Sequence, residues 1–168
     1  MHSKLDFIKS KIIWQADENL QRTAAIWKFQ NKKVVFTNGC FDILHRGHIE
    51  YLAKAAGYGD YLVVGLNSDE SVRKIKGKGR PIFDEESRAL MLASLHFVHR
   101  VVLFGQDTPY ELIQFLKPDI LIKGGDYKPV EIVGFDIVKA YGGKITTIEY
   151  IDGFSTTSII EKLRNQAG

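Results

Sequence analysis

Short strand-like runs alternate with helical segments about five times along most of this chain. The strand-like runs span residues 34–37, 61–66, 101–104, 120–122 and 145–148. The run at 61–66 is continuous in apolar character, as expected of a parallel strand that is covered on both faces. The intervening helices are predicted at about 48–56, 84–95, 109–117, up to Tyr141, and from Ser155 or Thr156 onward. This order, with short connections, predicts an α/β fold built on a doubly wound parallel sheet of about five strands.

The first 32 residues precede the first of these strands and are predicted to form a helical arm. Leu5, Ile8, Ile12 and Ile13 form one apolar stripe at helical spacing, and a second stripe contains Leu20, Ala24 and Trp27. Asp17 is expected to cap the second helix, and Asp84 is expected to cap the later helix that runs to Leu95. The sequence therefore divides into an arm at 1–32 and an α/β domain at 33–168.

Bulk composition restricts the class of protein. A chain of 168 residues can bury one substantial core. The net charge of +3 suits a small anionic substrate but is too weak to indicate nucleic acid by itself. No apolar run approaches the ~18 residues of a membrane span, and the single cysteine, Cys40, is compatible with a reducing compartment. We expect a cytoplasmic protein with neither a membrane nor a nucleic-acid partner.

The segment that joins the first strand to the first helix carries two histidines, His45 and His48. Two histidines three residues apart at a helix start can point at one anion, and the helix N-terminus adds free N–H donors. Gly47 between them leaves room for a phosphate. The alternative is a surface pair or a metal site, although a metal would require further ligands, of which only Asp42 is local.

Three further segments are candidates for binding phosphate or nucleotide. Hydroxyls at 155–158 open the last helix, and the alternative is an ordinary N-cap. The stretch 73–80 holds five cations and two glycines and is predicted to be a mobile loop; the alternative is a solvated loop or a weak nucleic-acid patch. After the fourth strand, the glycines within 123–126 permit close approach of a base or ribose, unless they simply form a tight turn.

The run N-G-C-F-D-I-L-H-R-G-H resembles the signature of the cytidylyltransferase-like nucleotidyltransferases, which implies a Rossmann-like domain. Class I aminoacyl-tRNA synthetases carry a related motif, but this chain is too short for one and lacks their lysine-serine motif. Across about 17–163 the chain is similar to the ADP-heptose-forming adenylyltransferase domain, often fused behind a sugar kinase. That similarity rests on L-N-S-D, K-G-x-G-R-P, D-T-P, K-G-G-D-Y-K-P and D-G-F-S-T-T. Without a kinase domain, this would be a stand-alone form.

The resemblance also assigns residues to roles. It implies catalytic roles for His45, His48 and Lys76. It implies nucleotide contacts for Gly39, Cys40, Phe41, Gly47, Lys123, Gly124, Gly125, Asp126, Ser155, Thr156 and Thr157. The implied acceptor contacts are Asn38, Asp42, Arg80 and Arg88. Mg²⁺ is expected to arrive with ATP, and Asp42 is the one candidate for a protein metal contact.

The implied reaction transfers AMP from ATP to a heptose 1-phosphate and releases pyrophosphate, as in ADP-heptose synthesis for lipopolysaccharide or surface glycans. The nucleophile is already anionic because a phosphate monoester has a second pKa near ~6, so no general base is required. A homodimer or higher homo-oligomer is expected. One alternative is cytidylyl or guanylyl transfer to another acceptor such as glycerol 3-phosphate. A non-catalytic nucleotide- or nucleic-acid-binding module is the alternative from another class.

Overall fold

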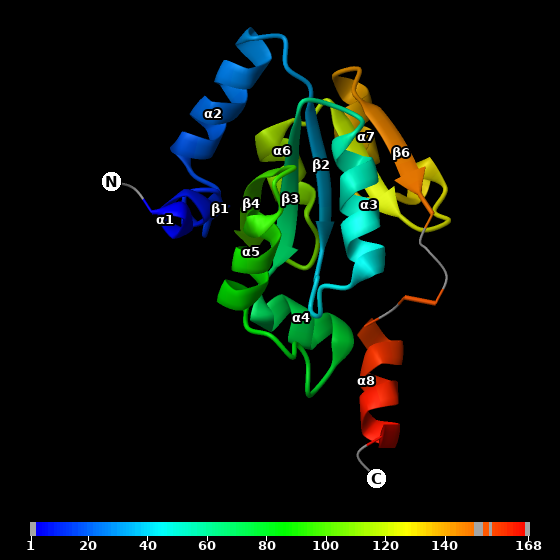
Figure 1. Ribbon diagram of the computed structural model, residues 1–168. Helices are drawn as coiled ribbons and strands as arrows, with labels where there is room; N and C mark the ends of the chain where they lie inside the picture. The colour runs from blue at the N-terminus through cyan, green and yellow to red at the C-terminus, as the bar shows by residue number, and fades with distance from the viewer. Residues whose placement is uncertain (1–2, 150–152, 155, 167–168) are drawn as a thin grey trace.

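Six parallel strands form the centre of the protein, as the computed structural model shows (Figure 1). It describes residues 3–149, 153–154 and 156–166. The strand order is β1-β4-β3-β2-β5-β6, and every neighbouring pair is parallel. The strands are β1 Ile12–Ile13, β2 Val34–Gly39, β3 Tyr61–Asn67, β4 Val98–Phe104, β5 Ile120–Gly124 and β6 Lys144–Ile148. This confirms the predicted α/β, Rossmann-like class.

Helices cover both faces of the sheet and make three layers (Figure 1). On one face, α3 (Arg46–Ala56) and α5 (Glu85–Ser94) pack on β2, β3 and β4. On the other face lie α2 (Glu18–Phe29), α6 (Tyr110–Leu116) and α7 (Phe135–Ala140). The remaining helical elements are α1 Lys4–Lys9, α4 Asp69–Lys76, the 3-10 turn η1 Pro129–Glu131 and α8 Thr156–Gln166.

The predicted helix starts depend on local capping, and two of them are confirmed. The Asp17 carboxylate accepts the N–H of Leu20, and the Asp84 carboxylate accepts the N–H of Ser87. Both caps satisfy one of the N–H groups that a first helical turn leaves without a partner. The last helix begins at Thr156, while Ser155, the other residue predicted to cap it, lies outside the described residues.

Two predictions about local structure are wrong. Residues 12–13 are not helical but form β1, which pairs with Val101 and Val102 of β4 at the edge of the sheet. Two isoleucines in succession fit a strand because β-branched side chains pack well on a pleated surface. The basic stretch is also not wholly a loop, since Arg73 to Lys76 form the last turn of α4. Its glycine-bearing part, from Gly77, follows the helix.

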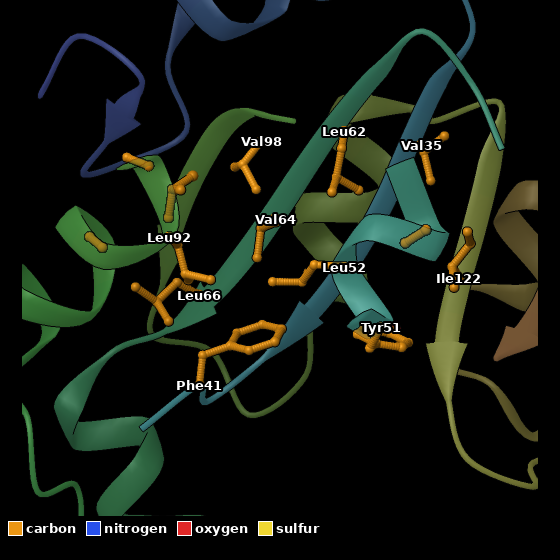
Figure 2. Close-up of a cluster of buried hydrophobic side chains, with 14 of the residues drawn as sticks. Val35, Phe41, Tyr51, Leu52, Leu62, Val64, Leu66, Leu92, Val98 and Ile122 are labelled. Atoms are coloured by element: carbon orange, nitrogen blue, oxygen red, sulfur yellow. The ribbon is translucent and has the colours of Figure 1, made fainter. Parts of the chain in front are cut away.

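The apolar core between the sheet and α3 extends to the carboxyl end of the strands (Figure 2). Leu62, Val64 and Leu66 of β3 run along it, and Phe41 and Tyr51 lie at its end (Figure 2). Tyr51 also shares a 2.6 Å hydrogen bond with the Thr37 hydroxyl of β2. These contacts hold the start of α3 firmly against β2, which positions the segment that carries the histidines.

No helix within the described part of the chain is long and apolar enough to cross a membrane.

Candidate active site

A cleft of about 1020 Å³ opens beyond the carboxyl end of β2. In this strand order β2 has β3 on one side and β5 on the other, so the cleft lies where the two halves of the sheet diverge, the usual ligand position in such folds. Predicted residues that line it are Asn38, Gly39, Cys40, Phe41, Asp42, His45, Gly47, His48, Lys76, Arg80, Lys123 and Thr156. The structure thus brings most of the predicted site together.

His45 is the N-cap of α3, and its cap fixes the state of its ring. The Nδ1 atom accepts the backbone N–H of His48 at 3.3 Å. An accepting Nδ1 carries no proton in the neutral ring, so the proton lies on Nε2 and this atom is the donor. Burial lowers the pKa of His45, which favours the same neutral form.

His48 stacks on His45, with ring centroids 3.7 Å apart and planes inclined by 18°. Burial, and next the proximity of His45, lower the pKa of His48 to about 4, while the Ile43 backbone opposes the shift. The Nδ1 atom of His48 is buried and has no well-aligned hydrogen bond to any described residue. A buried polar atom of this kind costs free energy unless a ligand or water satisfies it.

Gly47 lies where an added side chain would be crowded by Phe154 and His45. A Cβ atom there would be 3.0 Å from Cβ of Phe154 and 3.2 Å from the imidazole of His45. Phe154 lies just before α8. The absence of a side chain at Gly47 therefore allows Phe154 to lie close to His45. The atoms that crowd this position belong to the protein, so the predicted role of Gly47 in leaving room for a phosphate stays a prediction.

Residues 40–42 are held by two charged side chains. The Asp42 carboxylate accepts the N–H groups of Ile82 and Phe83 and the Nε–H of Arg80. Arg88 donates to the carbonyl oxygens of Cys40 and Phe83 and to the Asp69 carboxylate. The segment after β2 is therefore fastened both to the loop after α4 and to α5.

The structure argues against two of the roles implied by resemblance. The Arg88 side chain is 0% exposed and its three donor nitrogens all have protein partners, so no part of it faces an acceptor. Its contacts in this structure are those of a residue that holds the surrounding segments together. Asp42 does line the cleft, but its carboxylate already accepts three hydrogen bonds and its side chain is only 1% exposed, so little of it is available to a metal.

Three cations face the cleft from opposite walls. Lys76, at the end of α4, and Arg80 lie on one side, and Lys123, at the end of β5, lies on the other. Burial lowers the pKa of Lys123, and within the described part of the chain its ammonium has no hydrogen bond or ion pair. The cleft therefore combines positive charge with unsatisfied donors, which suits phosphate groups.

Cys40 does not have the character of a nucleophile. Burial raises the pKa of its thiol, and the cations of Lys76, Arg88 and Arg80 only partly oppose this effect. A thiol with a raised pKa is mostly protonated at neutral pH and reacts slowly. Its place in the cleft is consistent with a contact role only.

Some predicted nucleotide contacts lie away from the cleft or outside the described region. Among the described residues, Gly124, Gly125 and Asp126 are not part of the cleft wall, and the Gly125 N–H instead binds the carbonyl of Ile148. Ser155 and the side chain of Thr157 lie outside the part of the chain that the structure describes. The roles predicted for these five residues remain proposals.

Other residues that line the cleft had no assigned role. They are Tyr51, Asn67, Ile75, Asp107, Thr108, Pro109, Tyr127, Val133, Gly153, Phe154 and Lys162. Asn67, Asp107 and Tyr127 fall within the quoted segments L-N-S-D, D-T-P and K-G-G-D-Y-K-P, so position after a strand was a usable signal. Ile75, Val133 and Lys162 gave none, because only the fold brings their elements to the cleft.

A family comparison decides the identity of the domain. Residues 36–162 match the model of the family described as cytidylyltransferase-like. The chain belongs to the cytidylyltransferase-like family. The match spans both the histidine segment and the start of α8, and it confirms the predicted family and its nucleotidyltransferase class.

Curated relatives agree with that assignment. The chain is 55% identical over 141 residues to the bifunctional protein HldE of Geobacter metallireducens, covering 84% of this chain and 29% of that protein. It is 58% identical over 139 residues to bifunctional protein HldE of Campylobacter jejuni subsp. doylei, covering 83% of this chain and 29% of that protein. The chain thus spans less than a third of the length of these relatives.

A solved structure supports the fold. The crystal structure of the lipopolysaccharide core biosynthesis protein from Thermoplasma volcanium superposes with a TM-score of 0.60 at 30% identity. The superposition covers 71% of this chain and 97% of that one. The two chains share the same fold over the superposed region.

Proposed function

We propose that this chain transfers AMP from ATP to the phosphate of a heptose 1-phosphate, forming an ADP-heptose and releasing pyrophosphate. The observation that carries the proposal is the stacked His45–His48 pair at the start of α3, where it opens into a cleft with cations on both walls. The identity to the HldE proteins and the quoted K-G-G-D-Y-K-P and D-T-P segments support a heptose acceptor. The structural relative is named as a lipopolysaccharide core biosynthesis protein, which supports the same substrate class.

In the proposed reaction, an oxygen of the sugar phosphate attacks the α-phosphorus of ATP. The bond from that phosphorus to the β-phosphate oxygen breaks, and pyrophosphate leaves with the bonding electron pair. His45 and His48 donate to the α-phosphate oxygens as negative charge develops there. The first turn of α3 adds the positive end of the helix dipole and N–H donors other than that of His48, which His45 already accepts.

Further residues of the cleft neutralise or bind the phosphates of ATP. Lys76 neutralises the transferring group, while Thr156 and the backbone beside Phe154 hold the departing pyrophosphate. No side chain has to remove a proton, since the attacking phosphate is already ionised. Positioning and charge neutralisation are therefore sufficient, as in phosphoryl transfer generally.

Mg²⁺ is included in the proposal as an ion that accompanies ATP. Within the described residues, no three His, Cys, Asp or Glu side chains gather into a metal site, and the Asp42 carboxylate already accepts three hydrogen bonds. This donor set fits a cation held mainly by phosphate oxygens and water. When bound, Mg²⁺ would neutralise charge on the phosphates.

The proposal also includes a cytoplasmic location and a homo-oligomer. The single cysteine supports the first, because such a chain forms no internal disulfide. Exposed apolar side chains on the N-terminal helices, Phe7, Ile26 and Phe29, support the second. Light scattering on the purified chain would measure its mass in solution, and a monomer at all concentrations would contradict a homo-oligomer.

Pyrophosphate release tests the function directly. The chain is incubated with ATP, CTP or GTP, each paired with an anomer of a heptose 1-phosphate or with glycerol 3-phosphate. Pyrophosphate release is followed over time, and the nucleotide product is identified by mass spectrometry. We expect the highest kcat/KM with ATP and a heptose 1-phosphate, and turnover at least ~100-fold lower in His48→Ala. A preference for CTP with glycerol 3-phosphate would replace the proposal by the cytidylyl alternative, and nucleotide binding without turnover would replace it by a binding module.

A further inference from the structure

Two arginines lie within bonding distance of the segment after β2, and they use their guanidinium groups differently. Arg88 spends all three donor nitrogens on protein acceptors. Arg80 bonds through Nε alone, to Asp42. Within the described part of the chain, neither terminal nitrogen of Arg80 has a partner, and the residue lines the cleft.

The Asp42 carboxylate is buried and binds Arg80. Its side chain is 1% exposed, against 15% for that of Arg80. The Oδ1 atom accepts two backbone N–H groups, from Ile82 and Phe83, and Oδ2 accepts Nε–H of Arg80. A buried carboxylate held by three donors cannot easily turn, so it also sets the plane of the guanidinium that it binds.

We propose that Asp42 is a positioning residue that presents the two free nitrogens of Arg80 to the phosphate of the acceptor sugar. This inference rests on the proposed function. The resemblance already implies that Arg80 contacts the acceptor, and the new element is that Asp42 orients Arg80 toward the acceptor's phosphate. A guanidinium fixed at Nε leaves its Nη1 and Nη2 edge as a flat fork, which matches two oxygens of a phosphate. A phosphate monoester has three terminal oxygens, so the third stays free to attack.

The placement of Arg80 favours the acceptor over ATP. In the proposed reaction the α-phosphate of ATP takes its donors from His45, His48 and the start of α3 (Arg46–Ala56), and the outer phosphates take theirs from the start of α8 (Thr156–Gln166). Arg80 belongs to neither of these elements; it lies after α4, on the wall that carries Lys76. A dianion held there is drawn into the cleft without competing for the nucleotide donors.

Steady-state kinetics with both substrates varied tests the site. In Arg80→Ala we expect the KM for the heptose 1-phosphate to rise at least about tenfold while the KM for ATP stays within about twofold. Added guanidinium ion should restore part of the lost kcat/KM, because it can occupy the space beside Asp42. Lys78→Ala is the matched control: it removes one positive charge from the same loop, at an exposed residue that does not line the cleft.

Asp42→Asn tests positioning. The amide oxygen can still accept the N–H groups of Ile82 and Phe83, but its NH₂ group faces Nε–H of Arg80 and cannot accept from it. We expect this variant to fold and to raise the acceptor KM. In an Arg80→Ala background, the same substitution should add less than about twofold, because its effect acts through Arg80.

The outcomes separate this inference from the proposed function. If the unaltered chain transfers AMP to heptose 1-phosphate but Arg80→Ala raises the KM for ATP as much as that for the acceptor, Arg80 binds nucleotide and the inference fails alone. Unchanged acceptor KM in Arg80→Ala also overturns it, as does additivity of the two substitutions. If the unaltered chain shows no transfer to any sugar 1-phosphate, the proposed function fails, and the inference fails with it.

Discussion

Trp27 stacks on Tyr61, with ring centroids 4.3 Å apart and planes inclined by 17°, and thereby joins the N-terminal helix α2 to the first residue of β3. The guanidinium of Arg100 lies over the same indole, 5.6 Å from the ring centroid. On the other face, the buried ammonium of Lys11 donates to the carbonyl oxygens of Ala93 and Leu95 at the end of α5. The arm predicted as an added helical piece is therefore part of the folded core.

Removing the indole should destabilise the whole domain. Trp27 is 7% exposed, and we expect Trp27→Ala to lower the free energy of unfolding by about 3 kcal/mol or more through the lost stacking and the cavity left behind. Denaturant unfolding followed by far-UV circular dichroism measures the change. Gln21→Ala is the control on the same helix, because Gln21 is exposed and polar. Equal stability of the two variants would contradict the role of the stack.

Arg88 should behave as a structural residue and not as a substrate contact. In Arg88→Met we expect the free energy of unfolding to fall by about 3 kcal/mol, because two carbonyls and the Asp69 carboxylate lose their partner. Thermal and denaturant unfolding report the loss. An Arg88→Met chain of unchanged stability but with a raised acceptor KM would restore the role implied by resemblance.

The space at Gly47 should be essential for turnover. Alanine there brings Cβ to 3.0 Å from Phe154, so either the loop before α8 or the His45 ring has to shift. Displacement of a reacting group by about 1 Å can lower turnover by as much as ~100-fold, and we expect Gly47→Ala to lose at least tenfold in kcat. Gly105→Ala offers the comparison, since its added methyl meets only the Ser68 hydroxyl at an ordinary 3.5 Å. Equal kcat in both variants would rule out the steric explanation.

The lowered pKa of His48 predicts how stability depends on pH. Its pKa is about 4 in the folded chain against a usual 6.5, so the unfolded chain binds more protons between these values. The contribution of neutral His48 to the free energy of unfolding is therefore fully present above pH 6.5 and is lost as the pH drops toward 4. The lowered pKa of His45 acts in the same direction. We expect the Tm difference between pH 7.5 and pH 5 to be smaller in His48→Gln than in the unaltered chain. A Tm difference of the same size in both chains would show that His48 does not titrate in this way.

Much of the fold could be predicted because strands and caps are local signals. The run at 61–66 and the capping residues Asp17 and Asp84 appear in the structure where the sequence places them. The two errors have physical reasons. Ile12–Ile13 form a strand only because β4 offers them a partner, and α4 lacked a clear apolar stripe, with Val72 its one fully buried large apolar side chain.

The lining of the cleft was predictable where a residue lies at the end of a strand, as Gly39 ends β2 and Lys123 is the penultimate residue of β5. The different partners of Arg80 and Arg88 could not be predicted. The spacing of a motif shows that an arginine is present but not which acceptors it binds. Arg88 reaches Cys40, 48 positions away, only once α5 has packed beside the loop after β2. Long-range contacts of this kind carry no signature in a single sequence.

The central place of β2 has a consequence for how such a domain can diversify. The histidine segment lies between two walls that come from separate stretches of chain, residues 67–83 on the β3 side and 123–133 on the β5 side. Changes in one stretch can reshape one wall while the other keeps its geometry, so the reacting atoms remain in register. We expect descendants of this architecture to acquire new sugar or alcohol partners by altering one wall at a time, with the phosphate chemistry inherited intact.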